Sequence, residues 1–215
     1  MRRGKRRPIA GRGEILAAAR DIGVREGWKA VTIRSVALKL GYASPLLYEH
    51  FRDKEDLLTK IAVDALGQLE ARLAERLPSD RRGAAVIMVE RYWTFMLEHT
   101  QLYRLVNGMD GVPIDKTLVE RSAQSLCKVI AEAVRPLLGE NAREADGQVL
   151  ADELWALLHG MSALYMDRGA PFDLARVTNA VMTLIHGARM RSRGTGAAGS
   201  RGTSYGMRKS PCPEV

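Results

Sequence analysis

The stretch TIRSVALKLGYASPLLYEHF, residues 32–51, decides how the rest of the chain is interpreted. Its first half, residues 32–40, repeats apolar side chains at a spacing that places them on one face of a helix. Gly41 follows, where the end of a helix favours a residue that adopts positive φ. Ser44 and Pro45 then restart the chain as the expected N-cap and first helical residue. The stretch therefore predicts two short helices separated by a tight turn.

The second of these helices has few apolar side chains to bury. Leu47 and Phe51 recur at helical spacing and are expected to face the core. The other side chains are mostly small or able to form hydrogen bonds, and we expect them to face solvent. A helix of this kind after a tight turn has the geometry that enters a DNA major groove. Residues 32–51 thus predict a helix–turn–helix motif.

The positive charge of the 215-residue chain is concentrated at its two ends. Residues 1–53 hold 12 Lys and Arg against 5 Asp and Glu, and residues 189–215 hold 6 against 1. The middle, residues 54–188, holds 15 against 19 and is mildly acidic. Charged residues that served only solubility would not be divided into basic ends and an acidic middle. The basic front therefore indicates attraction to nucleic-acid phosphates.

Composition predicts an all-α globular protein, because Leu, Ala, Arg and Glu dominate and strand signals are scarce. No run of about 18 uninterrupted apolar residues occurs, so we expect no membrane partner. The N-terminal sequence lacks the apolar core of a secretory signal. Cys127 and Cys212 lie far apart without metal-ligand spacing, which fits a reducing cytoplasm better than a disulfide framework.

Two strings within and after the opening stretch resemble a known family. They are T-x-R-x-x-A-x-x-L-G at residues 32–41 and L-Y-x-H-F-x-x-K-x-x-L-L at residues 47–58. Over residues 9–69 the chain resembles the DNA-binding domain of the TetR (tetracycline-repressor) family of bacterial transcriptional regulators. The resemblance implies a three-helix N-terminal domain with the helix–turn–helix, a long connecting helix and a C-terminal helical domain for ligand binding and dimerisation.

The candidate DNA contacts follow from side-chain chemistry and from this resemblance. Hydroxyl and guanidinium groups at the start of the first short helix suit phosphate, whereas Pro45 and Leu46 offer only apolar contact, for example to a thymine methyl. Tyr48 and His50 resemble the family's phosphate-contacting pair. The full set is Thr32, Arg34, Tyr42, Ser44, Pro45, Leu46, Tyr48, His50 and Lys54.

The rest of the chain divides into four further segments. Residues 1–8 form a basic arm, either a disordered solubilising tail or a contact to the DNA backbone or minor groove. A long helix begins at the N-cap Asp53 and is expected to reach Pro78. Residues 79–189 form the C-terminal helical domain, interrupted most clearly at residues 107–113. Residues 190–215 are rich in Gly, Ser and Arg, which predicts a disordered basic tail.

The C-terminal domain has two expected partners, a second copy of the chain and an unknown small-molecule effector. The wide apolar stripes of residues 148–168 and 174–189 suit a two-fold four-helix interface. Trp155, His159 and Gly160 resemble the W-x-x-x-H-G signature of one C-terminal domain type in the family. For each effector candidate, ordinary core packing is the competing interpretation. The candidates are Trp93, Met96, Tyr103, Met109, Trp155, His159 and Met166.

No pattern in the sequence predicts catalysis, a cofactor or a metal. The four histidines form no H-E-x-x-H and no i,i+4 pair, and there is no P-loop or G-x-S-x-G string. The leading hypothesis is a cytoplasmic, nucleoid-associated homodimer that recognises a near-palindromic operator, a repressor released by a hydrophobic or amphipathic ligand. The alternatives are a ligand-independent architectural or constitutive DNA-binding protein, and a small-molecule-binding protein or enzyme on an all-α scaffold.

Overall fold

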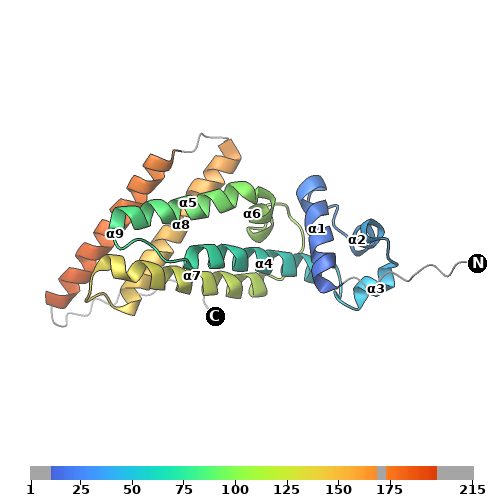
Figure 1. Ribbon diagram of the computed structural model, residues 1–215, viewed down its shortest axis with the longest axis horizontal. Coiled ribbons are helices and arrows are strands. Elements are labelled where there is room, and N and C mark those ends of the chain that lie inside the picture. Colours follow the sequence, from blue (N-terminus) through green and yellow to red (C-terminus); the bar gives the residue numbers. More distant parts are fainter. Residues whose placement is uncertain (1–10, 169–172, 198–215) are drawn as a thin grey trace, which may run out of the picture. The chain divides into compact units, whose positions relative to one another are not determined.

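The computed structural model describes residues 11–168 and 173–197, and every regular element within these ranges is an α-helix. The all-α class predicted from composition is therefore confirmed. In chain order (Figure 1) the helices are α1 (Arg12–Glu26), α2 (Ile33–Leu40), α3 (Ser44–Tyr48), α4 (Lys54–Ala74), α5 (Arg81–Glu98), α6 (Thr100–Val106), α7 (Lys116–Leu138), α8 (Glu144–Arg168) and α9 (Leu174–Ala197).

The described residues divide into two compact units. The first holds residues 11–65 and 100–119, and the second holds residues 66–99 with those after 119. Residues 100–119 thus belong with the helix–turn–helix, although their sequence does not distinguish them from the rest of the segment 79–189. The predicted domain boundaries at residues 69 and 79 stay predictions.

Helix α2 begins and ends as its sequence predicts. Thr32 is the N-cap, and its Oγ1 accepts the backbone N–H of Ser35 at 2.9 Å while the Ser35 Oγ accepts the N–H of Thr32 at 2.9 Å. This reciprocal capping box satisfies two N–H groups that the helix itself cannot pair. Gly41 ends the helix at φ 74° and ψ 30°, a left-handed conformation that glycine adopts without steric cost.

Helix α3 begins one residue earlier than predicted. Its N-cap is Ala43, whose side chain makes no capping hydrogen bond, and Ser44 is already helical. The prediction that Ser44 is the N-cap is therefore wrong. The turn closes through the N–H of Leu46, which donates to the carbonyl of Ala43 at 3.1 Å. Because Pro45 in this first turn has no N–H, the turn needs fewer capping partners.

The core of the first unit is closed by Trp28, which is 1% exposed. Its indole N–H donates to the carbonyl of Gln101 at 2.8 Å, which joins the α1–α2 connection to α6. The ring also lies against Gly23 of α1, where an added Cβ would come within 2.1 Å of it. Trp28 is thus the core plug that its position after a helix end predicts.

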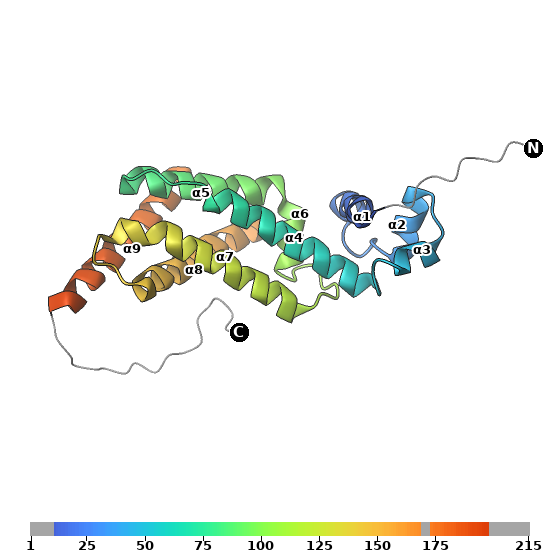
Figure 2. The ribbon, with the colours of Figure 1, turned by 60° about the horizontal axis from the view of Figure 1, so that its bottom comes forward.

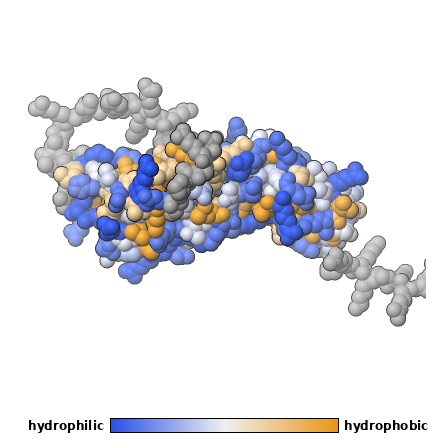
Figure 3. All heavy atoms as spheres, turned by 90° about the horizontal axis from the view of Figure 1, so that it is seen from above, coloured by the Kyte–Doolittle hydropathy of each residue, from blue (hydrophilic) through white to orange (hydrophobic). Residues whose placement is uncertain are grey.

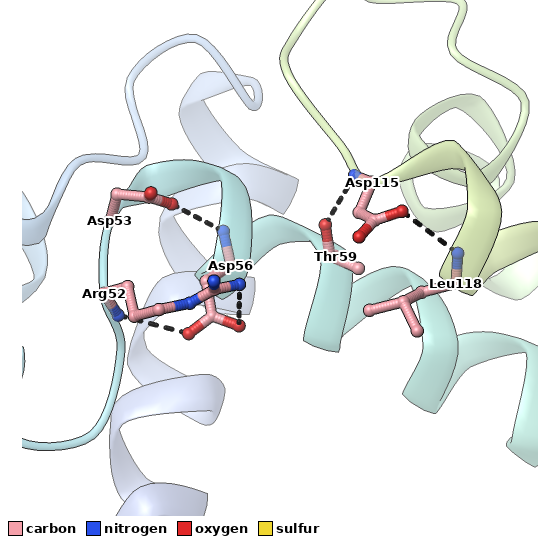
Figure 4. A network of polar contacts seen from close by, with 6 residues as sticks. All are labelled: Arg52, Asp53, Asp56, Thr59, Asp115 and Leu118. Carbon is pink, nitrogen blue, oxygen red and sulfur yellow. Dashed lines mark hydrogen bonds and ion pairs between the residues drawn. The ribbon is translucent and has the colours of Figure 1, made fainter.

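Hydrogen bonds also tie residues 100–119 to the start of α4 (Figure 4). Asp53 caps α4 by accepting the N–H of Asp56 at 2.8 Å, as predicted. Further along α4, the hydroxyl of the buried Thr59 accepts the N–H of Asp115 at 2.8 Å. Asp115 in turn accepts the N–H of Leu118 at 3.1 Å in the first turn of α7. The connection between α6 and α7 is therefore fixed on the helix that follows the helix–turn–helix.

In the second unit, α9 packs against both α5 and α8 (Figures 1 and 2). Helix α9 continues to Ala197, so the prediction of a disordered tail from residue 190 is wrong for residues 190–197. Arg191 donates to both carboxylate oxygens of Glu153 on α8 at 2.8 Å. This ion pair joins α9 to α8 at residue 191. Residues 198–215 lie outside the described residues, as do residues 1–8.

Two smaller expectations also need correction. Helix α4 ends at Ala74, before the predicted stop at Pro78. Helix α8 begins at Glu144, before residue 148, where the predicted apolar stripe starts. Cys127 is 1% exposed on α7. Cys212 lies outside the described residues, so the expectation of reduced cysteines stays a prediction.

The contact between Gly23 and Trp28 gives a stability prediction. We expect Gly23→Ala to destabilise the protein by about 1–3 kcal/mol, because the added methyl group overlaps a ring that its hydrogen bond holds in place. The measurement is the midpoint of urea unfolding followed by Trp fluorescence. The control is Gly67→Ala on α4, where an added Cβ meets nothing within 4 Å. A Gly23→Ala midpoint at or above the wild-type value would contradict the packing argument.

Candidate DNA interface and effector residues

The predicted recognition helix α3 presents the face that its sequence indicates. Leu47 and Phe51 are 0% and 1% exposed and hold the helix on the core. Pro45 is exposed on the outer side, and Tyr48 is 57% exposed. Three other candidates are partly exposed around them: Tyr42, Ser44 and Leu46.

The start of α2 offers a second group of polar atoms. Arg34 is exposed in its first turn and has no carboxylate partner among the described residues. The Thr32 hydroxyl is engaged in the capping box, and it also donates to the Ser35 Oγ at 3.0 Å. Thr32 therefore acts first on the helix itself, by fixing the end at which free N–H groups can meet an anion.

His50 and Lys54 are less accessible than their resemblance to phosphate contacts implies. The Nε2 atom of His50 is buried without a hydrogen-bond partner among the described residues, so a phosphate contact would use Nδ1. The Lys54 ammonium donates to the carbonyl of Lys29 at 2.9 Å and joins α4 to the α1–α2 connection. Partial burial lowers the pKa of Lys54, because desolvation disfavours its charged form.

Several basic side chains near the helix–turn–helix are neutralised within the first unit. Asp21 pairs with Lys39 of α2 and with Arg25, the latter at 2.9 Å. The hydrogen bond from Lys39 lowers the pKa of Asp21. Arg52 lies 3.8 Å from Asp56. The basic count of residues 1–53 therefore overstates the charge that this surface offers to a phosphate.

Arg12 is a further basic residue of this surface, outside the set predicted from the sequence. The guanidinium carbon of Arg12 lies over the Phe51 ring, 5.2 Å from its centroid, at the beginning of α1. Arg12 is exposed and has no carboxylate partner among the described residues. Because residues 12 and 51 are far apart in the chain, no local pattern could reveal this contact.

The effector candidates divide between the two units. Tyr103 and Met109 belong to the first unit, and Met109 is 39% exposed in the α6–α7 connection. The structure places the other five candidates in the second unit: Trp93, Met96, Trp155, His159 and Met166.

Aromatic rings connect several of these side chains in the second unit. Trp155 and His159 of α8 stack with their centroids 6.3 Å apart and an interplanar angle of 10°. Trp155 also meets Tyr92 of α5 edge-on at 6.4 Å, and Trp93 meets Tyr165 edge-on at 5.4 Å. The α5–α8 contact is therefore an aromatic cluster.

Polar atoms lie within this apolar region. Burial lowers the pKa of His159, because desolvation disfavours the imidazolium form. The hydroxyls of Ser162 on α8 and Thr178 on α9 are buried without a hydrogen-bond partner among the described residues. Trp93 and Met96 are 3% and 1% exposed, as ordinary core residues are. Groups of this kind suit an amphipathic ligand, while core packing alone also accounts for Trp93 and Met96.

A polar cavity of 220 Å³ lies in the first unit around the network of Figure 4. Its lining is mainly carboxylates with Arg52, so it offers few apolar walls to a hydrophobic ligand. Within residues 11–168 and 173–197, no group of three or more His, Cys, Asp or Glu side chains is arranged to hold a metal ion.

The outer surface shows no broad apolar face in the view of Figure 3. On the face drawn there, hydrophobic residues form small groups separated by hydrophilic ones. None of the helices in the described ranges combines the length and the apolar character that a membrane span requires.

Two family models match this chain. One, described as bacterial regulatory proteins of the tetR family, covers residues 15–61, which include α2 and α3. The other, described as a tetracyclin repressor-like C-terminal domain, covers residues 84–186. This description does not mention the W-x-x-x-H-G signature, so that assignment stays a prediction.

Curated proteins and solved structures show the same similarity. The HTH-type transcriptional activator FasR of Mycolicibacterium smegmatis is 30% identical over 188 residues, covering 80% of this chain and 85% of that protein. An uncharacterised HTH-type regulator of Mycobacterium tuberculosis is 28% identical over 179 residues, covering 81% and 79%. A tetR-family regulator structure from Streptomyces coelicolor superposes with a TM-score of 0.64 at 18% identity, covering 88% and 86%.

The lowered pKa of His159 predicts how stability depends on pH. In the unfolded chain this imidazole titrates near pH 6.5, so as the pH falls through about 6.5 the unfolded state binds more protons than the folded state. The stabilisation is complete above the unfolded pKa and is lost as the pH falls below it. We expect His159→Gln to reduce the fall in the urea-unfolding midpoint between about pH 7.5 and pH 5.

The matched control is His186→Gln, which changes an exposed histidine of α9 in the same unit. It should leave the pH dependence of the midpoint close to that of the wild type. An equally steep fall in His159→Gln and the wild type would show that burial of this imidazole does not affect stability.

Proposed function

Because the chain belongs to the TetR family of bacterial transcriptional regulators, we propose that it binds specific DNA sequences through α3. The observation that carries this proposal is the geometry of α2 and α3. A capping box and a left-handed glycine define α2, while Leu47 and Phe51 fix α3 with Pro45 and Tyr48 outward. Such a helix can enter the major groove with its N-terminal residues at base edges.

The proposed contacts separate into two groups. Ser44, Pro45 and Leu46 begin α3 and meet base edges, the last two through apolar contact only. The backbone phosphates are met by the remaining candidates, which fix register and orientation without reading sequence. With so few base contacts, part of the specificity rests on DNA shape. The residues proposed to contact phosphates are Thr32, Arg34, Tyr42, Tyr48, His50 and Lys54.

The proposed assembly is a homodimer formed through α8 and α9. Val149 and Leu164 of α8 are 49% and 50% exposed, and Met190 of α9 is 56% exposed. These apolar side chains support an interface with a second copy. A two-fold dimer would present its recognition helices about 34–36 Å apart to a near-palindromic operator. We place this complex in the cytoplasm, on the nucleoid.

The proposed mode of action is repression that a hydrophobic or amphipathic ligand relieves. The aromatic cluster of the second unit and the buried hydroxyls of Ser162 and Thr178 support a site there. A ligand changes DNA affinity only if it binds conformers with different operator affinity unequally. Activation is the second candidate, because the 30%-identical relative is described as an activator. A ligand-independent regulator is the remaining alternative.

The test of DNA recognition is selection of duplexes from a random-sequence pool by the full-length protein. We expect a near-palindromic sequence with half-sites about 10 base pairs apart to be enriched. Tyr48→Phe should weaken binding to the selected and to scrambled duplexes alike, by about threefold, because it removes one hydroxyl contact to phosphate. Tyr165→Phe in the second unit is the control.

Each outcome of the selection separates the hypotheses. Equal affinity for selected and scrambled duplexes would support an architectural protein and contradict a specific regulator. A reporter promoter that carries the selected site then distinguishes repression from activation, since a repressor lowers transcription and an activator raises it. Adding hydrophobic and amphipathic compounds to the selected complex shows whether a ligand releases it.

The homodimer gives a separate prediction. Leu164→Glu should weaken dimerisation by about a hundredfold, because a carboxylate would be buried without a partner. The mass is measured by light scattering across a dilution series. Leu97→Glu, which changes a 44% exposed leucine of α5 in the same unit, is the matched control. If Leu164→Glu and Leu97→Glu dimerise equally well, this face of α8 is not the interface.

A further inference from the structure

We propose that Arg12 is a DNA-phosphate contact of the first unit, held in position by the ring of Phe51. The inference rests on the proposed DNA-binding function and adds a residue outside its candidate set. Phe51 lies three residues after the last residue of α3, and its N–H donates to the carbonyl of Leu47 at 3.0 Å. The guanidinium of Arg12 therefore lies beside the end of the recognition helix.

The geometry of the contact leaves Arg12 able to bind a phosphate. At 5.2 Å from the ring centroid, the guanidinium is within the range of a cation–π interaction. A cation–π contact uses the charge of the guanidinium and takes up none of its N–H donors, so these stay available to phosphate oxygens. The ring thus limits the motion of the side chain without occupying its hydrogen bonds.

The electrostatic surroundings favour Arg12 over most of its basic neighbours. Arg25 on the same helix is paired with Asp21, as is Lys39 on α2. Along α1, α2 and the segment between them, the described basic side chains without a carboxylate partner are Arg12, Lys29 and Arg34. A charge already neutralised by a carboxylate releases fewer counterions from DNA than an unpaired one. Arg12 therefore adds to binding where Arg25 does not.

The test measures how non-specific DNA affinity depends on salt. The probe is a fluorescein-labelled duplex of about 30 base pairs of random sequence, titrated with full-length protein at about 50 to 200 mM KCl. Arg12→Gln should weaken binding about threefold to tenfold at the lowest salt. It should also reduce the slope of log affinity against log salt by about one per protomer bound.

Two matched variants complete the test. Arg25→Gln removes an arginine of the same helix that is already paired, and it should leave affinity and slope near the wild-type values. Arg12→Lys keeps the charge, so the slope should return to the wild-type value. Its affinity should stay lower, because an ammonium lacks the planar fork of donors. Circular dichroism and urea midpoints check that all variants are folded.

The outcomes distinguish this inference from the proposed function. If the wild type binds the duplex with a steep salt dependence and Arg12→Gln has the same slope, Arg12 is not a phosphate contact although the protein binds DNA. An Arg25→Gln slope reduced as much as that of Arg12→Gln also overturns the inference. If the wild type itself does not bind the duplex, the proposed function fails.

Discussion

The hydrogen bond from the Trp28 indole to the carbonyl of Gln101 is the interaction on which the first unit depends. An indole N–H buried without a partner costs free energy, and this partner lies 73 residues further along the chain. The bond brings α6 onto α1, and close packing of the ring against Gly23 fixes where it can form. The helix–turn–helix rests on this core through Ile33, Val36 and Leu47, which are all buried.

A second constraint is the distribution of charge on the same unit. A DNA-binding surface needs cations, but carboxylates of the unit pair with several of them. Asp21 engages two basic side chains, which stabilises the arrangement of α1 and α2 at modest strength because the pairs are exposed. Affinity for phosphate then rests on the charges that stay unpaired. Because some basic side chains are paired and others are not, a count of Lys and Arg identifies the DNA-binding surface but not the side chains that contact phosphate.

Local signals made the helix–turn–helix predictable from sequence. The cap of α2, the left-handed Gly41 and the inward Leu47 and Phe51 each depend on residues within a few positions of one another. The start of α3 was misplaced by one residue even so. A larger error arose where the deciding contact was distant. Helix α9 extends beyond residue 190 and carries a pair to Glu153, 38 residues away from Arg191.

The candidate sites show the same limit. Side-chain chemistry alone grouped seven effector candidates, but Tyr103 and Met109 belong to a different unit from the rest. The cation–π contact between Arg12 and Phe51 likewise depends on tertiary packing. Lys54 was selected for its resemblance to a phosphate contact, yet its ammonium also holds the carbonyl of Lys29. Residue types therefore indicate what a site can bind, and distant packing decides which side chains are free to do so.

The discontinuous first unit has a consequence for synthesis on the ribosome. Residues 11–65 emerge first. Two of their hydrogen-bond partners belong to residues 100–119, namely the Gln101 carbonyl, which accepts from Trp28, and the Asp115 N–H, which donates to Thr59. The intervening residues 66–99, which belong to the second unit, must therefore leave the ribosome before the DNA-binding unit can be completed. A nascent chain that stops before residue 100 would expose an unfinished core, so the two units are coupled in their folding order.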